Sequence, residues 1–446
     1  MTPLNRFALV VLVSMLVGAG LGAALVKRME PPTAVLAPPV GPGGLSAEIS
    51  VATYTPVEVD ALPGWITDSV APALPALQRS CARFTKFPAE EVVGPGAIAR
   101  PARAWQDACK ALAQVTEGDA ALRAALARDF TAYRVGPVQT QDGAEDQAAH
   151  DRGTFTGYYE ADLNGSLTRS GNYQVPIYGR PRNLVTVDLK DFLSPSVELP
   201  SGVPASLVGR VMPIAGPDGQ GAPRGGQVRP YYTRSEIDSE GAIAEDADVL
   251  VWADDPVAVH ILHIQGSGRV TLPDGQVLRI GFAGHNGRAF KGIGSILLEA
   301  GELKPGEASM ISVREWLALH PAAATTYMNR NTRYIFFRRL DPAETDAGPI
   351  GALGVSLTPL RSMAVDPRYI PLGAPVWLDT ADPDGVSMQR LMVAQDVGAA
   401  ITGVVRGDIF WGHGEAAFLK AGRMKSSGSY FVFVPRALGT SGAAAN

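Results

Sequence analysis

Three aspartates, Asp366, Asp396 and Asp408, could carry acid–base chemistry, because each stands beside a short apolar run and a turn-forming Gly or Pro. Asp408 falls between a Gly-rich turn and the segment IFW, which leaves its carboxyl poorly solvated. Poor solvation raises the pKa of a carboxyl and makes a proton donor available near neutral pH. We therefore expect Asp408 to be a general acid and base, and Asp396 to be a supporting carboxylate.

Turn formation is the alternative role for such residues, because an Asp beside Pro or Gly often bonds nearby backbone amides. On this ground Asp366, in VDP, is expected to be structural, and the same alternative stays open for Asp396, in QDVG. A calcium site built from the three carboxylates is a further alternative, although the segment lacks the spacing of an EF-hand.

Short strands and tight turns must position these carboxyls. Aliphatic runs at 376–378 and 391–393 are typical of strands, and the glycines between 398 and 407 predict turns. Such a structure brings acidic side chains to strand ends, where catalytic groups commonly lie.

The segments AVDP, IPLG, QDVG and GDIFWG resemble the three-aspartate (3D) domain of murein lytic transglycosylases. Upstream, FTGYYEADLNGSLTRSGNYQVPIYGRP and HILHIQGSGRV resemble the membrane-bound lytic murein transglycosylase A family, and the resemblance covers roughly residues 52 to 437. It implies cleavage of the β-1,4 bond between N-acetylmuramic acid and N-acetylglucosamine. The muramyl C6 hydroxyl would attack and leave a 1,6-anhydromuramic end, so that one carboxyl, Asp408, serves as acid and base.

The resemblance also implies two substrate-binding segments, Thr156, Gly157, Tyr158 and Tyr159 in the cleft, and Gln265, Gly266, Ser267 and Gly268 near the glycan. Without it, the two tyrosines would be one buried and one exposed strand residue. Glu160 is a further carboxylate to which no role is assigned. We expect neither a metal nor a cofactor, since His260 and His263 lie three apart in a predicted strand and would face opposite sides.

The 446 residues predict two or three domains, and 49 glycines and 35 prolines favour a loop-rich β architecture. Apolar faces predict helices over 74–84, 105–112 and 119–133, and strand candidates include 184–189, 209–214, 249–253, 257–272 and 276–284. With the resemblance, the expected fold is mainly β with flanking helices (α+β). A double-psi β-barrel main domain (52–160 and 290–437, with the three-aspartate segment at 363–435) would carry an inserted smaller β-barrel domain at 161–289.

The N-terminal segment 1–30 contains a run of twenty apolar residues, 7–26, long enough to span a membrane as a helix. An uncleaved anchor is expected and a cleaved signal is the alternative; Lys27 and Arg28 conflict with the anchor's orientation under the positive-inside rule. No cysteine precedes Cys81, which departs from the lipoproteins typical of the resembled family. A Pro-rich linker (31–51) follows, and the tail 438–446 is expected to be disordered.

Export decides the expected state of the only two cysteines, Cys81 and Cys109. In a periplasmic protein they would form a structural disulfide, and in a cytosolic one they would be buried thiols. The net charge of -5 argues against a nucleic-acid partner. The expected partners are peptidoglycan glycan strands, cell-envelope assembly proteins and, through the N-terminal segment, a membrane.

Two other functions stay open. A murein hydrolase with two carboxylates would release reducing ends. A non-catalytic peptidoglycan-binding scaffold would need no poorly solvated carboxyl, so the set of Asp366, Asp396 and Asp408 argues against it.

Overall fold

The computed structural model describes residues 52–115, 118–137, 152–192, 206–213, 226–341 and 348–436. The predicted anchor (1–30), linker (31–51) and C-terminal tail (438–446) lie outside these residues. Within the described ranges, no helix has both the length and the apolarity that a membrane span requires.

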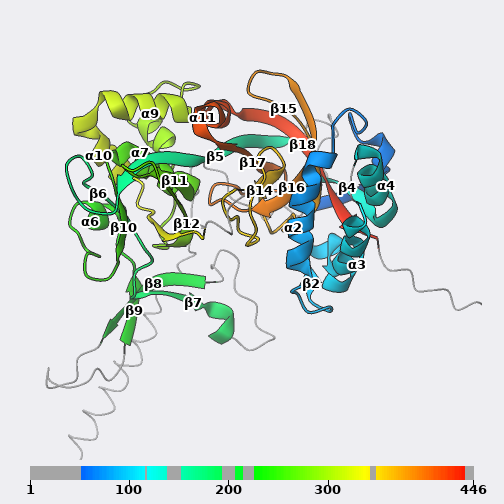
Figure 1. Cartoon of the computed structure of the whole chain (residues 1–446), viewed down its shortest axis with the longest axis horizontal. Coiled ribbons are helices and arrows are strands. Elements are labelled where there is room, and N and C mark those ends of the chain that lie inside the picture. Colours follow the sequence, from blue (N-terminus) through cyan, green and yellow to red (C-terminus); the bar gives the residue numbers. More distant parts are fainter. Residues whose placement is uncertain are drawn as a thin grey trace, which may run out of the picture. The chain divides into compact units, whose positions relative to one another are not determined.

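A mixed sheet of 13 strands dominates the described chain, and β5 (Gly153–Ser166) joins its two parts (Figure 1). One part runs, in sheet order, through β1 (Ala52–Val57), β4 (Phe130–Pro137), β18 (Lys425–Pro435), β15 (Pro375–Ala381), β16 (Ser387–Asp396), β14 (Ser362–Val365) and β17 (Arg406–His413) to β5. The other continues through β11 (Ser267–Thr271), β12 (Val277–His285) and β13 (Ile335–Arg339), with β10 (Val249–Ala253) pairing both β5 and β6 (Val175–Tyr178). The mainly β architecture with flanking helices is thereby confirmed.

Three helices pack with the first part of the sheet in one apolar core: α2 (Leu74–Phe84), α3 (Ala102–Ala113) and α4 (Asp119–Asp129). The first two follow the prediction, and Cys81 of α2 is disulfide-bonded to Cys109 of α3. The predicted third helix is wrong beyond Asp129, because Phe130 begins β4, which pairs with both β1 and β18. Pairing with strands distant in sequence outweighed the local helical pattern.

The predicted strand over 257–272 is wrong in its first part, which forms helix α7 (Pro256–Gln265). The Asp255 side chain caps this helix by accepting from the backbone N–H of Val257 at 2.8 Å, and Pro256 occupies its first turn. The helix is buried among apolar residues, so no amphipathic period distinguishes it from a buried strand.

The helical conformation also corrects the argument about His260 and His263. Residues three apart lie on one side of a helix, so the reason given against a shared ion was wrong. The described residues contain no group of three or more side chains suited to hold a metal ion.

The remaining elements are a separate three-stranded sheet, a two-stranded pair, five helices and four 3-10 turns among the described residues. They are the separate sheet of β7 (Leu184–Asp188), β8 (Ser206–Pro213) and β9 (Gly226–Pro230), the pair β2 (Val92–Val93) and β3 (Arg100–Pro101), the helices α6 (Arg234–Asp238), α8 (Ile293–Glu299), α9 (Met310–Leu319), α10 (Pro321–Asn329) and α11 (Gly414–Arg423), and the 3-10 turns η1 (Val59–Ala61), η2 (Ala71–Ala73), η3 (Gly96–Ile98) and η4 (Leu189–Phe192).

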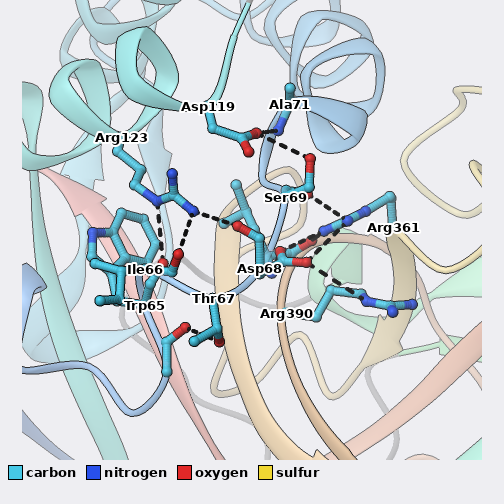
Figure 2. Close-up of polar contacts among 12 residues, drawn as sticks. Trp65, Ile66, Thr67, Asp68, Ser69, Ala71, Asp119, Arg123, Arg361 and Arg390 are labelled. Atoms are coloured by element: carbon cyan, nitrogen blue, oxygen red, sulfur yellow. Dashed lines mark hydrogen bonds and ion pairs between the residues drawn. The ribbon is translucent and has the colours of Figure 1, made fainter.

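A buried ion pair braces the strands that carry the three-aspartate segment (Figure 2). The Asp68 carboxylate accepts from Arg361 Nη1 at 2.8 Å and Nη2 at 3.2 Å, and from the backbone N–H of Leu391 at 3.0 Å. Arg361 also donates to the carbonyl oxygens of Ser69 and Leu391, at 2.7 and 3.0 Å. Because Arg361 precedes β14 and Leu391 belongs to β16, the pair fixes these strands to the loop before α2.

The same loop is held from its other side by α4. Arg123 donates to the carbonyl oxygens of Trp65 and Ile66 at 3.2 and 3.4 Å, and Asp119 accepts from the backbone N–H of Ala71 at 2.7 Å (Figure 2). Charged side chains thus satisfy the backbone of a loop without regular secondary structure.

Candidate active site

Strand β14 lies between β16 and β17, and its residue Ala364 is in register with both Asp396 and Asp408. A bulge in the β14–β16 pairing places Asp396, rather than Gln395, opposite Ala364. Bulges of this kind re-aim side chains next to functional sites. Residues in register project from the same face of a sheet, so the carboxyls stand on one face with backbones ~10 Å apart, two strand spacings.

Strand β5 supplies a hydrogen-bond donor to each of these carboxylates. It pairs in parallel with β17, so that Asp408 is in register with Thr156. Thr156 Oγ1 donates to Asp408 Oδ1 at 2.6 Å, and the Tyr158 hydroxyl donates to Asp396 Oδ2 at 2.9 Å. Alternate residues of one strand therefore hold the two acids.

The intervening residue, Gly157, permits β5 to approach helix α11. A Cβ atom at this position would lie 2.6 Å from Trp411 Nε1 and 2.8 Å from the Cα of Ala421. A larger residue would push the strand away and displace the donors on either side of it, so the glycine has a steric role.

The two carboxyls differ in how they are solvated and bonded. Burial raises the pKa of Asp408 to about 6; the Thr156 hydrogen bond and the charge of Arg406 oppose this rise, and the charge of Asp396 adds to it. Burial also raises the pKa of Asp396, against hydrogen bonds from the N–H groups of Ala352 and Val397 and from Tyr158. Asp408 is only partly buried, so it is a carboxyl near solvent that can hold a proton close to neutral pH.

Asp366 belongs to a different environment. It is 2% exposed and accepts hydrogen bonds from Arg368 and from the backbone N–H of Gly403, the latter at 2.8 Å. Burial alone would raise its pKa, but these hydrogen bonds and the Arg368 charge outweigh burial and lower it. Its polar contacts join two turns, and within the described ranges the three aspartates do not form a group suited to a metal ion.

The other predicted binding residues, Tyr159 and the segment Gln265 to Gly268, form a second group. The backbone N–H of Tyr159 donates to Gln265 Oε1 at 2.9 Å, and the Tyr159 ring packs against Phe418. Gly266 ends α7 in the left-handed conformation, with Ser267 and Gly268 opening β11. The segment from Gln265 to Gly268 therefore contacts β5 at the backbone of Tyr159, next to Tyr158 of the first group.

Glu160, to which the sequence assigned no role, is fully buried and paired with Arg279 at 2.6 Å. Its charge is therefore balanced inside the fold. Arg406 is the functional candidate that sequence reasoning missed: its Nη2 donates to Thr156 Oγ1 at 2.8 Å. Turns were predicted around Arg406, so nothing in the sequence indicated that Arg406 and Asp408, two residues apart, share a face of strand β17.

Comparisons with known proteins match two segments of the chain to known domains. Residues 154–338 match the MltA specific insert domain, and residues 361–434 match the 3D domain. The membrane-bound lytic murein transglycosylase A of Escherichia coli K12 is 29% identical over 286 residues, which are 62% of this chain and 64% of that protein. The alignment thus spans less than two thirds of that relative.

Two crystal structures extend the match over most of the described chain. MltA from Neisseria gonorrhoeae, in its monoclinic form, is 31% identical with a TM-score of 0.67, covering 86% of this chain and 93% of that one. The membrane-bound lytic murein transglycosylase from Agrobacterium tumefaciens is 29% identical with a TM-score of 0.68, covering 86% of this chain and 98% of that one. With its insert, its 3D domain and this shared fold, the chain belongs to the MltA family of lytic transglycosylases.

Proposed function

We propose that this protein is a peptidoglycan lytic transglycosylase with Asp408 as its single acid and base. It would cleave the β-1,4 bond between N-acetylmuramic acid and N-acetylglucosamine and form 1,6-anhydromuramic ends during cell-wall turnover. The observation that carries the proposal is the Asp408 carboxyl, whose pKa is raised to about 6 and which accepts a hydrogen bond from Thr156. Family membership supplies the substrate class.

In the first step, protonated Asp408 gives its proton to the glycosidic oxygen as the bond to the muramyl C1 breaks. The muramyl C6 hydroxyl then attacks C1 from within the same sugar, and its proton passes to the Asp408 carboxylate. The enzyme returns to its starting protonation state. An internal nucleophile needs little additional ordering, so a second catalytic carboxyl is not required. A pKa near the working pH suits a group that must donate and then accept.

Asp396 would support this chemistry through its charge. Its position across β14 favours the protonated form of Asp408 before the first step. The Tyr158 hydroxyl and two backbone N–H groups hold the Asp396 carboxylate in place, all at 2.9 Å. The catalytic assignments are thus Asp408 for proton transfer and Asp396 for support, with Asp366 structural.

Glycan strands are the proposed ligand, and the cleft residues Thr156 to Tyr159 and the segment Gln265 to Gly268 are the proposed contacts. The MltA of E. coli has been crystallised with bound chitohexaose; it is 22% identical to this chain and shares its fold with a TM-score of 0.58. We extend a glycan ligand of this kind to the present chain as part of the proposal.

Two barrels are the proposed finer form of the fold, a double-psi barrel for the main domain and a smaller one for the insert at 161–289. The smaller barrel would also include β13 (Ile335–Arg339), which lies beyond residue 289: a bridge between Gly179 and Phe337 links β13 to the end of β6. Since β6 pairs β10 and β10 pairs β5, the pairings return to the strand where they began. A periplasmic location, membrane attachment through the N-terminal segment and contacts with cell-envelope assembly proteins belong to the same proposal.

The decisive experiment is mass spectrometry of the products that the full chain releases from purified murein. Anhydromuropeptides support the proposal, whereas reducing ends indicate a two-carboxylate hydrolase and binding without release indicates a scaffold. Asp408→Asn should fold normally and release nothing. Asp274→Asn, in an exposed turn of the insert, is the matched control and should retain activity. Activity in folded Asp408→Asn would refute the assignment.

A further inference from the structure

Arg406 is fixed beside Asp408 by the backbones of two strands. Its Nη1 donates to the carbonyl oxygen of Thr154 at 3.1 Å and also to that of Gly407. Its Nη2 donates to Thr156 Oγ1 at 2.8 Å. The parallel register of β17 and β5 sets Arg406 against Thr154 and Asp408 against Thr156, so the guanidinium and the carboxyl meet the same hydroxyl.

The donors and acceptors of Arg406, Thr156 and Asp408 restrict where the proton of Asp408 can lie. A guanidinium can only donate, so Thr156 Oγ1 must accept from Arg406. The hydroxyl proton is then directed at Asp408 Oδ1, at 2.6 Å. If the acid proton of Asp408 were also on Oδ1, it and the Thr156 hydroxyl proton would both lie between Thr156 Oγ1 and Asp408 Oδ1. The hydroxyl would then lose its acceptor. The arrangement therefore favours the proton on Oδ2.

We propose that Arg406 is a positioning residue that, acting through Thr156, keeps the transferable proton of Asp408 on Oδ2. This inference rests on the function proposed above. In the first step the Oδ2–H bond breaks as the glycosidic oxygen gains the proton. In the second, Oδ2 accepts the proton of the C6 hydroxyl, while Thr156 stays bonded to Oδ1. One oxygen thus performs both transfers, and the carboxyl need not rotate.

The positive charge of Arg406 has a second consequence for the cycle. After the first transfer Asp408 is a carboxylate in a site where burial disfavours that form. A fixed cation favours the carboxylate, so it keeps the group able to act as a base in the second step. Without it, Asp408 would remain protonated over a wider pH range and would accept the C6 proton less readily.

The test is the pH profile of kcat/KM for anhydromuropeptide release from murein by full-length variants. Arg406→Gln should move the limb on the alkaline side upward by about one pH unit, since a nearby opposite charge lowers a carboxyl pKa by at least that amount. Activity at neutral pH should fall about tenfold or more, in line with a misplaced acid. Thr156→Val should shift the limb in the same direction, and Thr156→Ser should restore the wild-type profile.

Arg152→Gln is the matched control. Arg152 is exposed and joins the start of β5 to β18 by donating to Ser427, at 3.2 Å to Oγ and 3.0 Å to the carbonyl oxygen. Its loss tests the strand contact without touching Thr156 or Asp408, so the limb should not move. The double variant Arg406→Gln/Thr156→Val should be no worse than the more affected single variant, because both residues act through one hydrogen-bond chain.

A uniform loss of activity in Arg406→Gln, with the alkaline limb unmoved, would show that Arg406 only supports the fold and would overturn the inference. An unshifted Thr156→Val would overturn it as well. If Arg406→Gln does not fold, judged by circular dichroism, the contrast between Thr156→Val and Thr156→Ser decides. Asp408→Asn separates the two proposals. Activity in folded Asp408→Asn would refute Asp408 as the acid. If Asp408→Asn is inactive but the alkaline limbs of Arg406→Gln and Thr156→Val do not move, only the role of Arg406 is refuted.

Discussion

Asp396 and Asp408 approach the same residue, Ala364 of β14, from the strands on its two sides. The relation sets two acids on one sheet face with different partners: Tyr158 and two backbone N–H groups for Asp396, and Thr156 for Asp408. It follows that one acid is anchored by several donors while the other has an oxygen available for chemistry. Similar residues with different surroundings can divide a task in this way.

The free energy of unfolding should depend on whether Asp408 is ionised. Its pKa is raised from 3.8 to about 6 in the folded state, so the folded protein favours the protonated carboxyl. The contribution of this group is fully present below pH 4 and is lost as the pH rises through about 6. Asp408→Asn should therefore be more stable than the wild type by about 1–3 kcal/mol at pH 8, and nearly equal to it at pH 4. Urea denaturation at both pH values measures this; a variant equally destabilised at both would contradict it.

Tyr158 should matter through its hydroxyl rather than its ring. Burial and the nearby Asp396 raise the pKa of Tyr158 well above 10, so the hydroxyl is a neutral donor at every working pH. Tyr158→Phe would leave Asp396 with two donors, costing about 1–2 kcal/mol of stability and roughly tenfold in activity. Tyr178→Phe, a buried tyrosine of the insert, is the control. Wild-type rates in Tyr158→Phe would remove Asp396 support from the mechanism.

Asp68 should be important for stability although it lies outside the site. Its side chain and that of Arg361 are 7% and 9% exposed, so removing one partner leaves a charge buried. Asp68→Asn should cost about 3–5 kcal/mol. Asp107→Asn, which breaks the exposed pair with Lys110, should cost less than about 1 kcal/mol. Thermal and chemical denaturation compare the two, and equal losses would argue against the brace.

His260 and His263 should make the protein sensitive to acid. Both are buried, and burial with the nearby Arg234 charge lowers each pKa well below 6.5. They stay neutral in the folded state but bind protons when the chain is unfolded. The free energy of unfolding is therefore highest above about pH 6.5 and falls as the pH drops below that value. Each histidine adds up to about 1.4 kcal/mol per pH unit to that fall.

The corresponding variant is His260→Leu, because neither ring nitrogen of His260 has a hydrogen-bond partner among the described residues. The slope of stability between pH 6 and 5 should become shallower by about the contribution of one histidine. An unaltered slope in His260→Leu would show that His260 is charged in the fold.

The sequence contained enough information to predict that the Asp408 carboxyl is poorly solvated, because the apolar segment after it is local. The register that sets it against Thr156 is not local: the two residues are 252 positions apart, and no periodicity in either strand specifies their pairing. The same limit explains why Tyr158 was placed in the cleft without its partner Asp396. The resemblance supplied the segment, and the pairing of β5 with β17 showed which carboxylates its side chains contact.

Helix α7 failed to be predicted for a different physical reason. Most of its residues are apolar and six of its ten are buried, so the alternation of apolar and polar positions that separates helix from strand is missing. The local signal was at its beginning, where Asp255 precedes Pro256, a pair suited to a helix start. Asp68 and Arg361 had no such signal, since their value comes from burial that only the fold creates.

The position of β18 has a consequence for how the protein comes into being. It is the last strand that the structure describes, yet it lies between β4 and β15 and also pairs with β5, setting Lys425 beside Thr156. A polypeptide still emerging from a ribosome or a translocation pore lacks this strand, so its sheet stays open beside the residue that holds Asp408. Under the proposed function, the site around Asp408 would therefore be complete only after β18 has been synthesised and has paired with β5.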